Sequence, residues 1–408
     1  MSNFVRLCVC VRVGRTLQRA KLLKMNIGFY LIIAVAFLVS GCVAAILIPG
    51  IVKVAVKKEL YDMPDERHIH VGLVPRLGGV AFFPAMLLSL LVAFLLHMSS
   101  SFEVGDVAFL PMTQLLIAGV GGLIMYLTGV ADDLVGVRYR YKFLTQALAA
   151  SLMCFSGVWI SNFHGFLGIY DIPAWFGVPF TVLVVMLVVN SINLIDGIDG
   201  LSSGLCIMGI TAFAVVFILN GYYRFAILSA AALGCLVPFY CYNVFGKPEK
   251  RNKIFMGDTG TLFMGYLLAF LAVKATTVQA IPEHASPAFY LICSASILLL
   301  PALDLMRVFF NRIKRGRNPF MPDKTHIHHK FLALDFSMRQ ARWIIFLISA
   351  LFFVMNMLLA FAGININIIF IADVVFWCVF HVIVTRMIMK RYERPGIVTI
   401  NTDLININ

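Results

Sequence analysis

Acidic and amide side chains recur at regular spacing in one short stretch of this sequence. The run Asn190-Ser-Ile-Asn-Leu-Ile-Asp-Gly-Ile-Asp-Gly places Asn190, Asn193, Asp196 and Asp199 three residues apart. On a helix this spacing lines one face, so we expect the four polar side chains to converge. A polar interhelical loop with Asp caps would explain the two glycines but not the spacing. The run therefore favours a site of chemistry over a simple connection.

Three further acids form two other motifs. Asp132 and Asp133 are adjacent carboxylates, which repel each other and need a cation or a shared proton. Asp258 stands in the run Phe-Met-Gly-Asp-Thr-Gly, where a lone Asp is usually a helix cap. Mg²⁺ prefers a few carboxylate or amide oxygens and keeps water and phosphate as its other ligands. Together the acids indicate a hard-cation site, with a solvated helix-end pair and a cap as the alternatives.

A basic segment rich in histidine lies towards the C-terminus. It contains Arg315, Arg317, His326, His328 and His329. Three histidines suggest zinc, but no cysteine stands nearby and Arg and Lys crowd the segment. Cations repel a metal ion and attract a diphosphate, so we favour anion recognition, with zinc or a solvated loop as alternatives.

Lesser polar features occur at the ends of other apolar stretches. Arg76 precedes one stretch, Lys142 follows the aspartate pair, and Asn243 ends another stretch. For each of these, a helix cap or an ordinary basic loop residue is an equally good interpretation.

Composition places these motifs in a membrane. Of the 408 residues, 61% are hydrophobic and 13% are charged, against about 45–50% and about 25% in soluble domains. This excludes a soluble enzyme, a disordered chain and a coiled coil. The apolar residues run in continuous blocks and do not alternate with polar ones, which argues against a β-barrel.

The apolar blocks predict an all-α polytopic membrane protein with about 11 transmembrane helices, since a spanning helix needs about 20 apolar residues. The candidate spans are 26–51, 78–97, 109–131, 142–161, 176–195, 201–219, 223–244, 259–280, 286–309, 341–362 and 364–389. Short connections favour a single transmembrane domain over 25–390, with a tail at 391–408.

The basic residues assign the two sides of the membrane. On alternate loops fall 25 of the 33 Lys and Arg residues, and a single one, Arg224, falls on the opposite loops. Because cytoplasmic loops collect Lys and Arg, we expect the C-terminus to be cytoplasmic and the N-terminus to be outside. The motifs then lie at cytoplasmic ends of spans, which predicts an active site on cytoplasmic loops.

The first 24 residues break this charge rule. They carry six Lys and Arg residues and no acid, yet they would lie outside. Met25 directly precedes the first span, so we hypothesise that translation starts there and that 1–24 is not translated. The alternative is a basic extension held inside, with a different topology for the first helix.

The ordered set of motifs resembles the polyprenyl-phosphate N-acetylhexosamine-1-phosphate transferases. The aspartate pair, the Asn-x-x-Asn-x-x-Asp-Gly-x-Asp-Gly run, the Phe-Met-Gly-Asp-Thr-Gly run and the His-Ile-His-His run occur in the family's order within about residues 60–335. The resemblance implies transfer of an N-acetylhexosamine-1-phosphate from a UDP-sugar to undecaprenyl phosphate, with release of UMP. It also implies Mg²⁺ as cofactor, with Mn²⁺ as a substitute, and an enzyme of the bacterial inner membrane.

The ending Asp-Lys-Thr-His-Ile-His-His resembles the branch that acts on UDP-N-acetylglucosamine and primes surface polysaccharides such as O-antigen. The alternative is the peptidoglycan branch, which uses a Pro-Ile-His-His-His-type ending. The implied partners are the UDP-sugar, undecaprenyl phosphate, the bilayer and a second copy of the chain in a homodimer, with no nucleic acid.

The resemblance also implies roles for the acids and amides. Asp258 matches the principal Mg²⁺ ligand, with Asn193 beside it. Asp132 and Asp133 match the pair that engages the acceptor phosphate, one of them a candidate base. The remaining acids of the spaced run, Asp196 and Asp199, match catalytic positions that shape the nucleotide and metal site.

The basic and histidine residues match substrate-binding positions of the family. His326, His328, His329, Arg315 and Arg317 correspond to the loop that grips the diphosphate or the sugar. A phosphate contact is implied for Lys142, and Asn243 is included among the substrate-binding residues.

Two other classes of protein, an anion transporter and a non-catalytic scaffold, explain the motifs less well. An anion transporter predicts charges near mid-span and discontinuous helices in related halves, whereas the motif acids here sit at the ends of predicted spans. A non-catalytic scaffold leaves the three-residue spacing of the Asn and Asp run unexplained.

Overall fold

The fold is a bundle of long helices. The computed structural model describes residues 2–61, 74–99, 109–279, 281–282, 284–316, 318 and 325–392. The long helices are α1 (Ser2–Lys57), α2 (Phe82–Ser99), α3 (Phe109–Val135), α4 (Tyr139–Phe155), α5 (Ala174–Leu194), α6 (Leu201–Leu219), α7 (Tyr223–Phe245), α8 (Gly257–Thr276), α9 (Phe289–Lys314), α11 (Met338–Phe361) and α12 (Ile366–Tyr392). The short elements are η1 (Gly78–Ala81), β1 (Asn162–Phe166), β2 (Ile169–Asp171), η3 (Pro248–Lys250) and α10 (Ile327–Ala333).

Ten of the described helices are long and apolar enough to span a membrane. A helix bonds its own backbone polar groups, which is what an apolar bilayer requires. The remaining predicted span, 142–161, corresponds to α4. This helix is 17 residues long, and it begins and ends earlier in the chain than the predicted span. The prediction of a helical polytopic membrane protein is therefore confirmed, with ten candidate spans in the described part of the chain.

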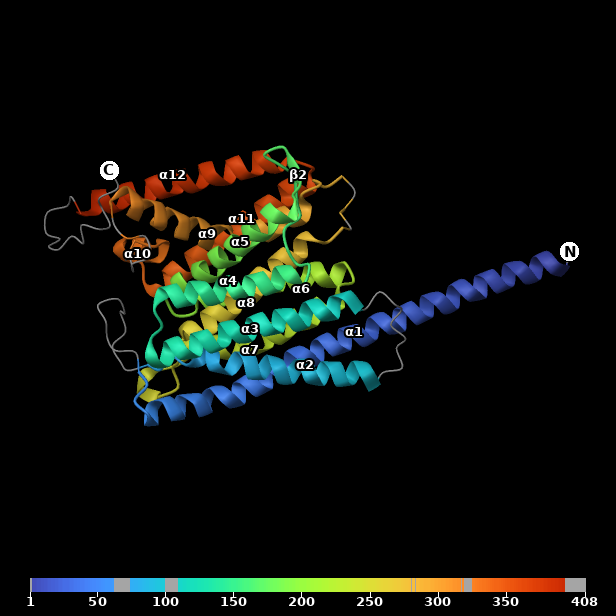
Figure 1. Cartoon of the computed structure of the whole chain (residues 1–408), viewed down its shortest axis with the longest axis horizontal. Helices are drawn as coiled ribbons and strands as arrows, with labels where there is room; N and C mark the ends of the chain where they lie inside the picture. The colour runs from blue at the N-terminus through green and yellow to red at the C-terminus, as the bar shows by residue number, and fades with distance from the viewer. Residues whose placement is uncertain are drawn as a thin grey trace.

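The two ends of the bundle carry different short elements. The hairpin of β1 and β2 lies at one end, and α10 lies at the other (Figure 1). The sequence predicted only a loop where the hairpin forms. Residues 2–24 continue α1 as one helix that projects beyond the bundle (Figure 1), and the start at Met25 stays a prediction.

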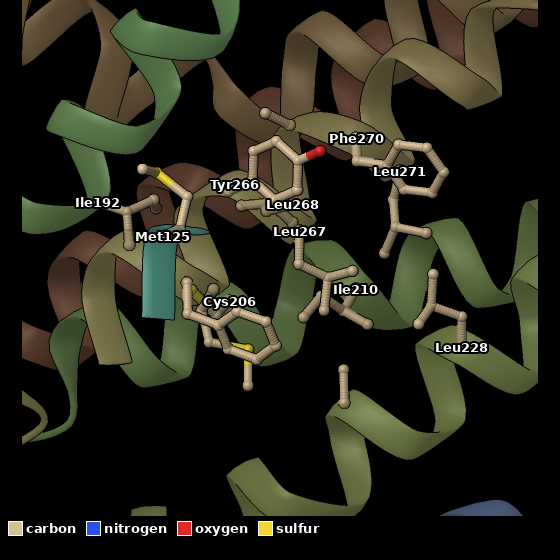
Figure 2. Packing of buried hydrophobic residues seen from close by; sticks show 14 of the residues in the cluster. Met125, Ile192, Cys206, Ile210, Leu228, Tyr266, Leu267, Leu268, Phe270 and Leu271 are labelled. Atoms are coloured by element: carbon tan, nitrogen blue, oxygen red, sulfur yellow. The ribbon is translucent and has the colours of Figure 1, made fainter. Parts of the chain in front are cut away.

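Helix α8 forms the centre of the bundle. Every residue from Thr259 to Ala275 is buried, as expected for a helix that is apolar all round. Figure 2 shows its residues packed against helices that come from distant parts of the sequence. The residues labelled there are Tyr266, Leu267, Leu268, Phe270 and Leu271 of α8, and Met125, Ile192, Cys206, Ile210 and Leu228 of its neighbours. This packing fixes the position of the N-terminus of α8.

The last turns of α3 lie directly against the first turn of α8. A Cβ atom on Gly129 would lie 2.3 Å from the Cα of Thr259, so only glycine allows this approach. On the other side of α8, a Cβ on Gly79 would lie 2.1 Å from the backbone N of Gly260. The contact at Gly129 brings the aspartate pair next to Asp258, and the contact at Gly79 packs η1 against α8.

Candidate active site

A cavity of about 240 Å³ opens at the end of the bundle that carries α10. Its walls come from the end of α5, the turn that follows it, the start of α8 and the start of α10. The lining residues are Arg76, Asn193, Leu194, Asp196, Gly197, Ile198, Asp199, Asn243, Phe255, Met256, Gly257, Asp258, Thr261, His326, His328 and His329. Eight of the predicted site residues are thus brought together.

Beside the cavity, Lys142 links two carboxylates. Its Nζ lies 2.6 Å from Oδ2 of Asp132 and also donates to Oδ2 of Asp258. The Oδ1 atom of Asp132 accepts a 2.7 Å hydrogen bond from the backbone N of Val137, which holds this carboxylate at the end of α3. The ammonium group therefore supplies the positive charge that two neighbouring carboxylates need.

The second aspartate of the pair has a different environment. Asp133 accepts hydrogen bonds from the backbone N atoms of Asp258 (2.8 Å) and Thr259 (2.9 Å) and from the hydroxyl of Thr259 (2.6 Å). It thus caps the N-terminus of α8 from another helix. Gly257 permits this approach, since it has a φ of +70° and a Cβ there would lie 2.6 Å from Oδ2 of Asp133. Asp133 therefore positions Asp258 in this structure, and its contact with the acceptor phosphate stays a prediction.

Asn193 orients Asp258 from the opposite side. Its Nδ2 donates to Oδ1 of Asp258 at 3.0 Å and to Oγ1 of Thr261 at 2.8 Å. The amide nitrogen therefore faces the carboxylate, and Asn193 supports the predicted metal ligand in this arrangement. Asp258 is consequently held by α3, α4 and α5 together.

Asp196 is an acid of the cavity whose charged neighbours are mainly other carboxylates. Its side chain makes no hydrogen bond with the residues that the structure describes. Burial raises the pKa of Asp196 well above its ordinary value, and the carboxylates of Asp258 and Asp199 raise it further. A cation or a proton in the cavity would relieve this repulsion.

Asp199 is bound by basic residues. Its Oδ2 lies 2.5 Å from Nζ of Lys253, and its backbone O accepts a 2.6 Å hydrogen bond from Nη1 of Arg342. The sequence motifs did not include Lys253 or Arg342. Both are long side chains in loops or helix starts, and nothing in their local spacing connects them with Asp199.

Asn243 holds two segments of the backbone together through its side-chain amide. Its Oδ1 accepts a 2.6 Å hydrogen bond from the backbone N of Gly200, and its Nδ2 donates to the backbone O of Ile254 at 2.8 Å. Both ends of the amide therefore join two cavity-lining segments. These contacts give Asn243 a structural role, and its place among the substrate-binding residues stays a prediction.

The expectation for Asn190 was wrong. Asn190 lies about one turn before Asn193 in α5 and is not among the residues that line the cavity. Its Nδ2 instead donates to Oε1 of Gln146 in α4 at 2.7 Å. Asn193, at the end of α5, lines the cavity together with Asp196 and Asp199, which lie in the turn after Leu194 and not on a continued helix.

Three histidines form one side of the cavity, which we call the histidine wall: His326, His328 and His329. His326 precedes α10, and His328 and His329 lie in its first turn. Burial holds the pKa of His328 well below its ordinary value, with smaller contributions from the two neighbouring histidines. This imidazole is therefore neutral near pH 7.

One arginine of the same motif does not line the cavity. Arg315 ends α9, where its backbone N bonds to the backbone O of Asn311, and it is not among the lining residues. Arg317 lies outside the described residues.

Replacing Gly197 with alanine is expected to lower activity by about tenfold and to change the unfolding temperature little. A Cβ at this position would lie 2.4 Å from Nε2 of His328, so the buried ring would have to shift within the cavity wall. Steady-state kinetics of the purified variant would measure the effect. Gly119→Ala is the matched control, because a Cβ there meets nothing within 4 Å, and an equal loss in both variants would contradict the prediction.

The residues fit a hard divalent cation that is bound by few protein ligands. In the described part of the chain, no group of three or more His, Cys, Asp or Glu residues could by itself hold a metal ion. Asp258 and Asp196 nevertheless offer carboxylate oxygens to the same cavity. Mg²⁺ is commonly bound by one or two carboxylates, with water and substrate phosphate completing its shell.

The fold and the cavity define a class: a polytopic helical membrane protein with a carboxylate-rich site at one end of its bundle. The sequence profile of glycosyl transferase family 4 matches residues 115–276, the part that carries the aspartate pair, the spaced run and Asp258. This match and the order of the motifs support the resemblance that was inferred from the sequence.

Individual bacterial proteins are similar over most of the chain. A Bacillus subtilis protein, named as a probable undecaprenyl-phosphate N-acetylglucosaminyl 1-phosphate transferase, is 29% identical over 88% of this chain and 94% of its own length. Undecaprenyl-phosphate alpha-N-acetylglucosaminyl 1-phosphate transferases of Yersinia pestis and Escherichia coli K12 are 29% and 28% identical, over 73% of this chain and 76% of theirs.

Proposed function

We propose that this protein transfers N-acetylglucosamine-1-phosphate from UDP-N-acetylglucosamine to undecaprenyl phosphate and releases UMP. The observation that carries the proposal is the cavity in which Asp196, Asp258 and the histidine wall meet. The names of its relatives supply the donor sugar and the acceptor lipid. The peptidoglycan branch is not favoured, because these relatives are named for N-acetylglucosamine.

The chemistry is an in-line displacement at the β-phosphorus of the donor. An oxygen of the lipid phosphate forms a new bond to the β-phosphorus. The bond between the β-phosphorus and the oxygen that bridges it to the α-phosphate breaks, and UMP leaves with this bridging oxygen. No general base is needed for an acceptor phosphate that is already largely ionised near neutral pH. The chain must therefore bring two anions together and hold them in line.

The protein's own charges are arranged for this task. Lys142 offers an ammonium group beside the cavity, and Arg76 and the histidine wall face the donor from the other sides. Asp258, oriented by Asn193 and by the cap at Asp133, is the residue that would hold Mg²⁺, with Asp196 as a second oxygen ligand. The bound cation would offset the repulsion between the two phosphates.

The membrane arrangement is part of the proposal. Counting α4 as a span gives eleven crossings, with the N-terminus outside and the C-terminus and cavity on the cytoplasmic side of the bacterial inner membrane. The asymmetry of Lys and Arg supports this orientation. Helix α1 begins and α12 ends at opposite ends of the bundle (Figure 1), which agrees with an odd number of crossings. A homodimer is proposed from the resemblance, and light scattering in detergent tests it.

A transfer assay tests the function. Purified protein with radiolabelled UDP-N-acetylglucosamine and undecaprenyl phosphate is expected to form a lipid-soluble label and an equal amount of UMP. EDTA should remove at least about 90% of the activity, since the proposed cation offsets charge in the transition state, and excess Mg²⁺ should restore it. UDP-N-acetylgalactosamine serves as the comparison donor. Lipid labelling without UMP release, or no labelling with either donor, would refute the proposed reaction.

A further inference from the structure

A buried carboxylate outside the sequence motifs contacts the histidine wall. Asp304 lies in α9 and is 2% exposed. Its Oδ2 lies 2.9 Å from Nδ1 of His326 and accepts a 3.1 Å hydrogen bond from the backbone N of Ile327. Its Oδ1 accepts a 2.7 Å hydrogen bond from Nη2 of Arg307. Asp304 thus joins α9 to the residue at which α10 begins.

These contacts determine how the ring of His326 is used. Since a carboxylate only accepts hydrogen bonds, Nδ1 carries a proton that it donates to Asp304. The other ring nitrogen, Nε2, is buried and has no partner among the described residues, and His326 is 4% exposed and lines the cavity. A buried polar atom without a partner beside a cavity indicates a ligand that completes it.

The charges around Asp304 suit an anionic ligand. The guanidinium of Arg307 offsets the carboxylate and also donates to the backbone O of Thr325 at 2.6 Å. Lys330 is buried in α10, where its Nζ donates to Oγ1 of Thr385 at 3.0 Å. Two basic side chains therefore stand against one acid behind the histidine wall, and a negatively charged group in the cavity meets no net repulsion from this side.

We propose that Asp304 is a positioning residue, which fixes the ring of His326 so that Nε2 binds the diphosphate of the nucleotide-sugar donor. This inference rests on the proposed function. Residues that fix the tautomer and orientation of a functional histidine in this way act through that histidine, so removing either partner should have nearly the same effect.

A double-mutant cycle tests this coupling. The dissociation constant of UDP is measured by calorimetry, with Mg²⁺, for the wild type, Asp304→Asn, His326→Ala and the double variant. Each single change should weaken UDP binding about tenfold, and the double variant should be no weaker than His326→Ala. The KM for undecaprenyl phosphate should stay unchanged. Additive losses would overturn the inference.

Lys330→Met provides the control for a general loosening of α10. It removes a side-chain anchor to α12 at an equally buried position, and it leaves the hydrogen bond from the backbone N of Lys330 to the backbone O of His326 in place. Its effect on UDP binding should therefore add to that of His326→Ala. If the cycle of Lys330→Met with His326→Ala showed the same coupling energy as the cycle of Asp304→Asn with His326→Ala, only the stability of α10 would matter. That result would overturn the positioning role of Asp304.

A second measurement leaves Asp304 intact, in case Asp304→Asn does not fold. Added imidazole should restore UDP binding to His326→Ala, because it can donate one N–H to Asp304 and present its other nitrogen to the ligand. N-methylimidazole has no N–H and should not restore binding. Equal rescue by both compounds, or by neither, would contradict the inference. A wild-type protein that does not bind UDP would instead refute the proposed function.

Discussion

Asp258→Ala is expected to abolish sugar-phosphate transfer while the protein stays folded. The carboxylate lines the cavity, accepts from Asn193 and Lys142, and is the proposed cation ligand. Its loss removes the charge that would hold Mg²⁺ against the donor, which should lower kcat at least about a thousandfold. In this variant Lys142 keeps its ion pair with Asp132 and Asn193 keeps its hydrogen bond to Thr261, so the unfolding temperature should change little.

The assay is transfer of radiolabel to undecaprenyl phosphate, with thermal unfolding of the same preparation in detergent. Glu249→Ala is the matched control, because Glu249 is an exposed acid in η3 and does not line the cavity. Wild-type activity in Asp258→Ala would refute the assignment of Asp258. Loss of activity with loss of the folded state would refute the claim that the residue serves chemistry rather than stability.

Asp133→Ala is expected to lower both activity and stability. The carboxylate accepts three hydrogen bonds from the first turn of α8, and without it two backbone N–H groups lose their partners. Such a loss costs about 1–3 kcal/mol. Because Asp258 stands in the same turn, we also expect transfer to fall about a hundredfold, the cost of a small misplacement in an aligned site.

Asp132→Ala separates the two members of the pair. Asp132 bonds to Lys142 and to one backbone N–H at the end of α3, but it does not cap α8. This variant should lose activity with a smaller change in unfolding temperature than Asp133→Ala. The same unfolding temperature for Asp133→Ala and the wild type would contradict the capping role, and equal destabilisation of both variants would show that the pair acts as one unit.

Lys142 explains how these acids coexist in a partly buried place. Its ammonium group contacts both Asp132 and Asp258, while Asp196 has no described donor. A cation that approaches Asp258 therefore meets a carboxylate already shared with Lys142 and a second one without a partner. We therefore propose that Asp196 increases the affinity of the cavity for positive charge.

The sequence alone determined the class of protein and the membership of the site. Apolar blocks longer than a bilayer is thick leave few folds other than a helical bundle. Motif order then grouped Asp196, Asp258 and the histidines, which the structure places at one cavity. These properties depend on composition and on short segments, so they can be read without knowing how the helices pack.

Only the tertiary structure decided which role each polar residue has. Neighbouring residues on a helix point about 100° apart, so Asp132 faces Lys142 while Asp133 faces the start of α8. The contacts of Asn243 and Asp304 likewise join segments 11 and 22 residues away. Spacing along the chain predicts which residues share a face of one helix, but the partner of a side chain is chosen by the helix that packs against it.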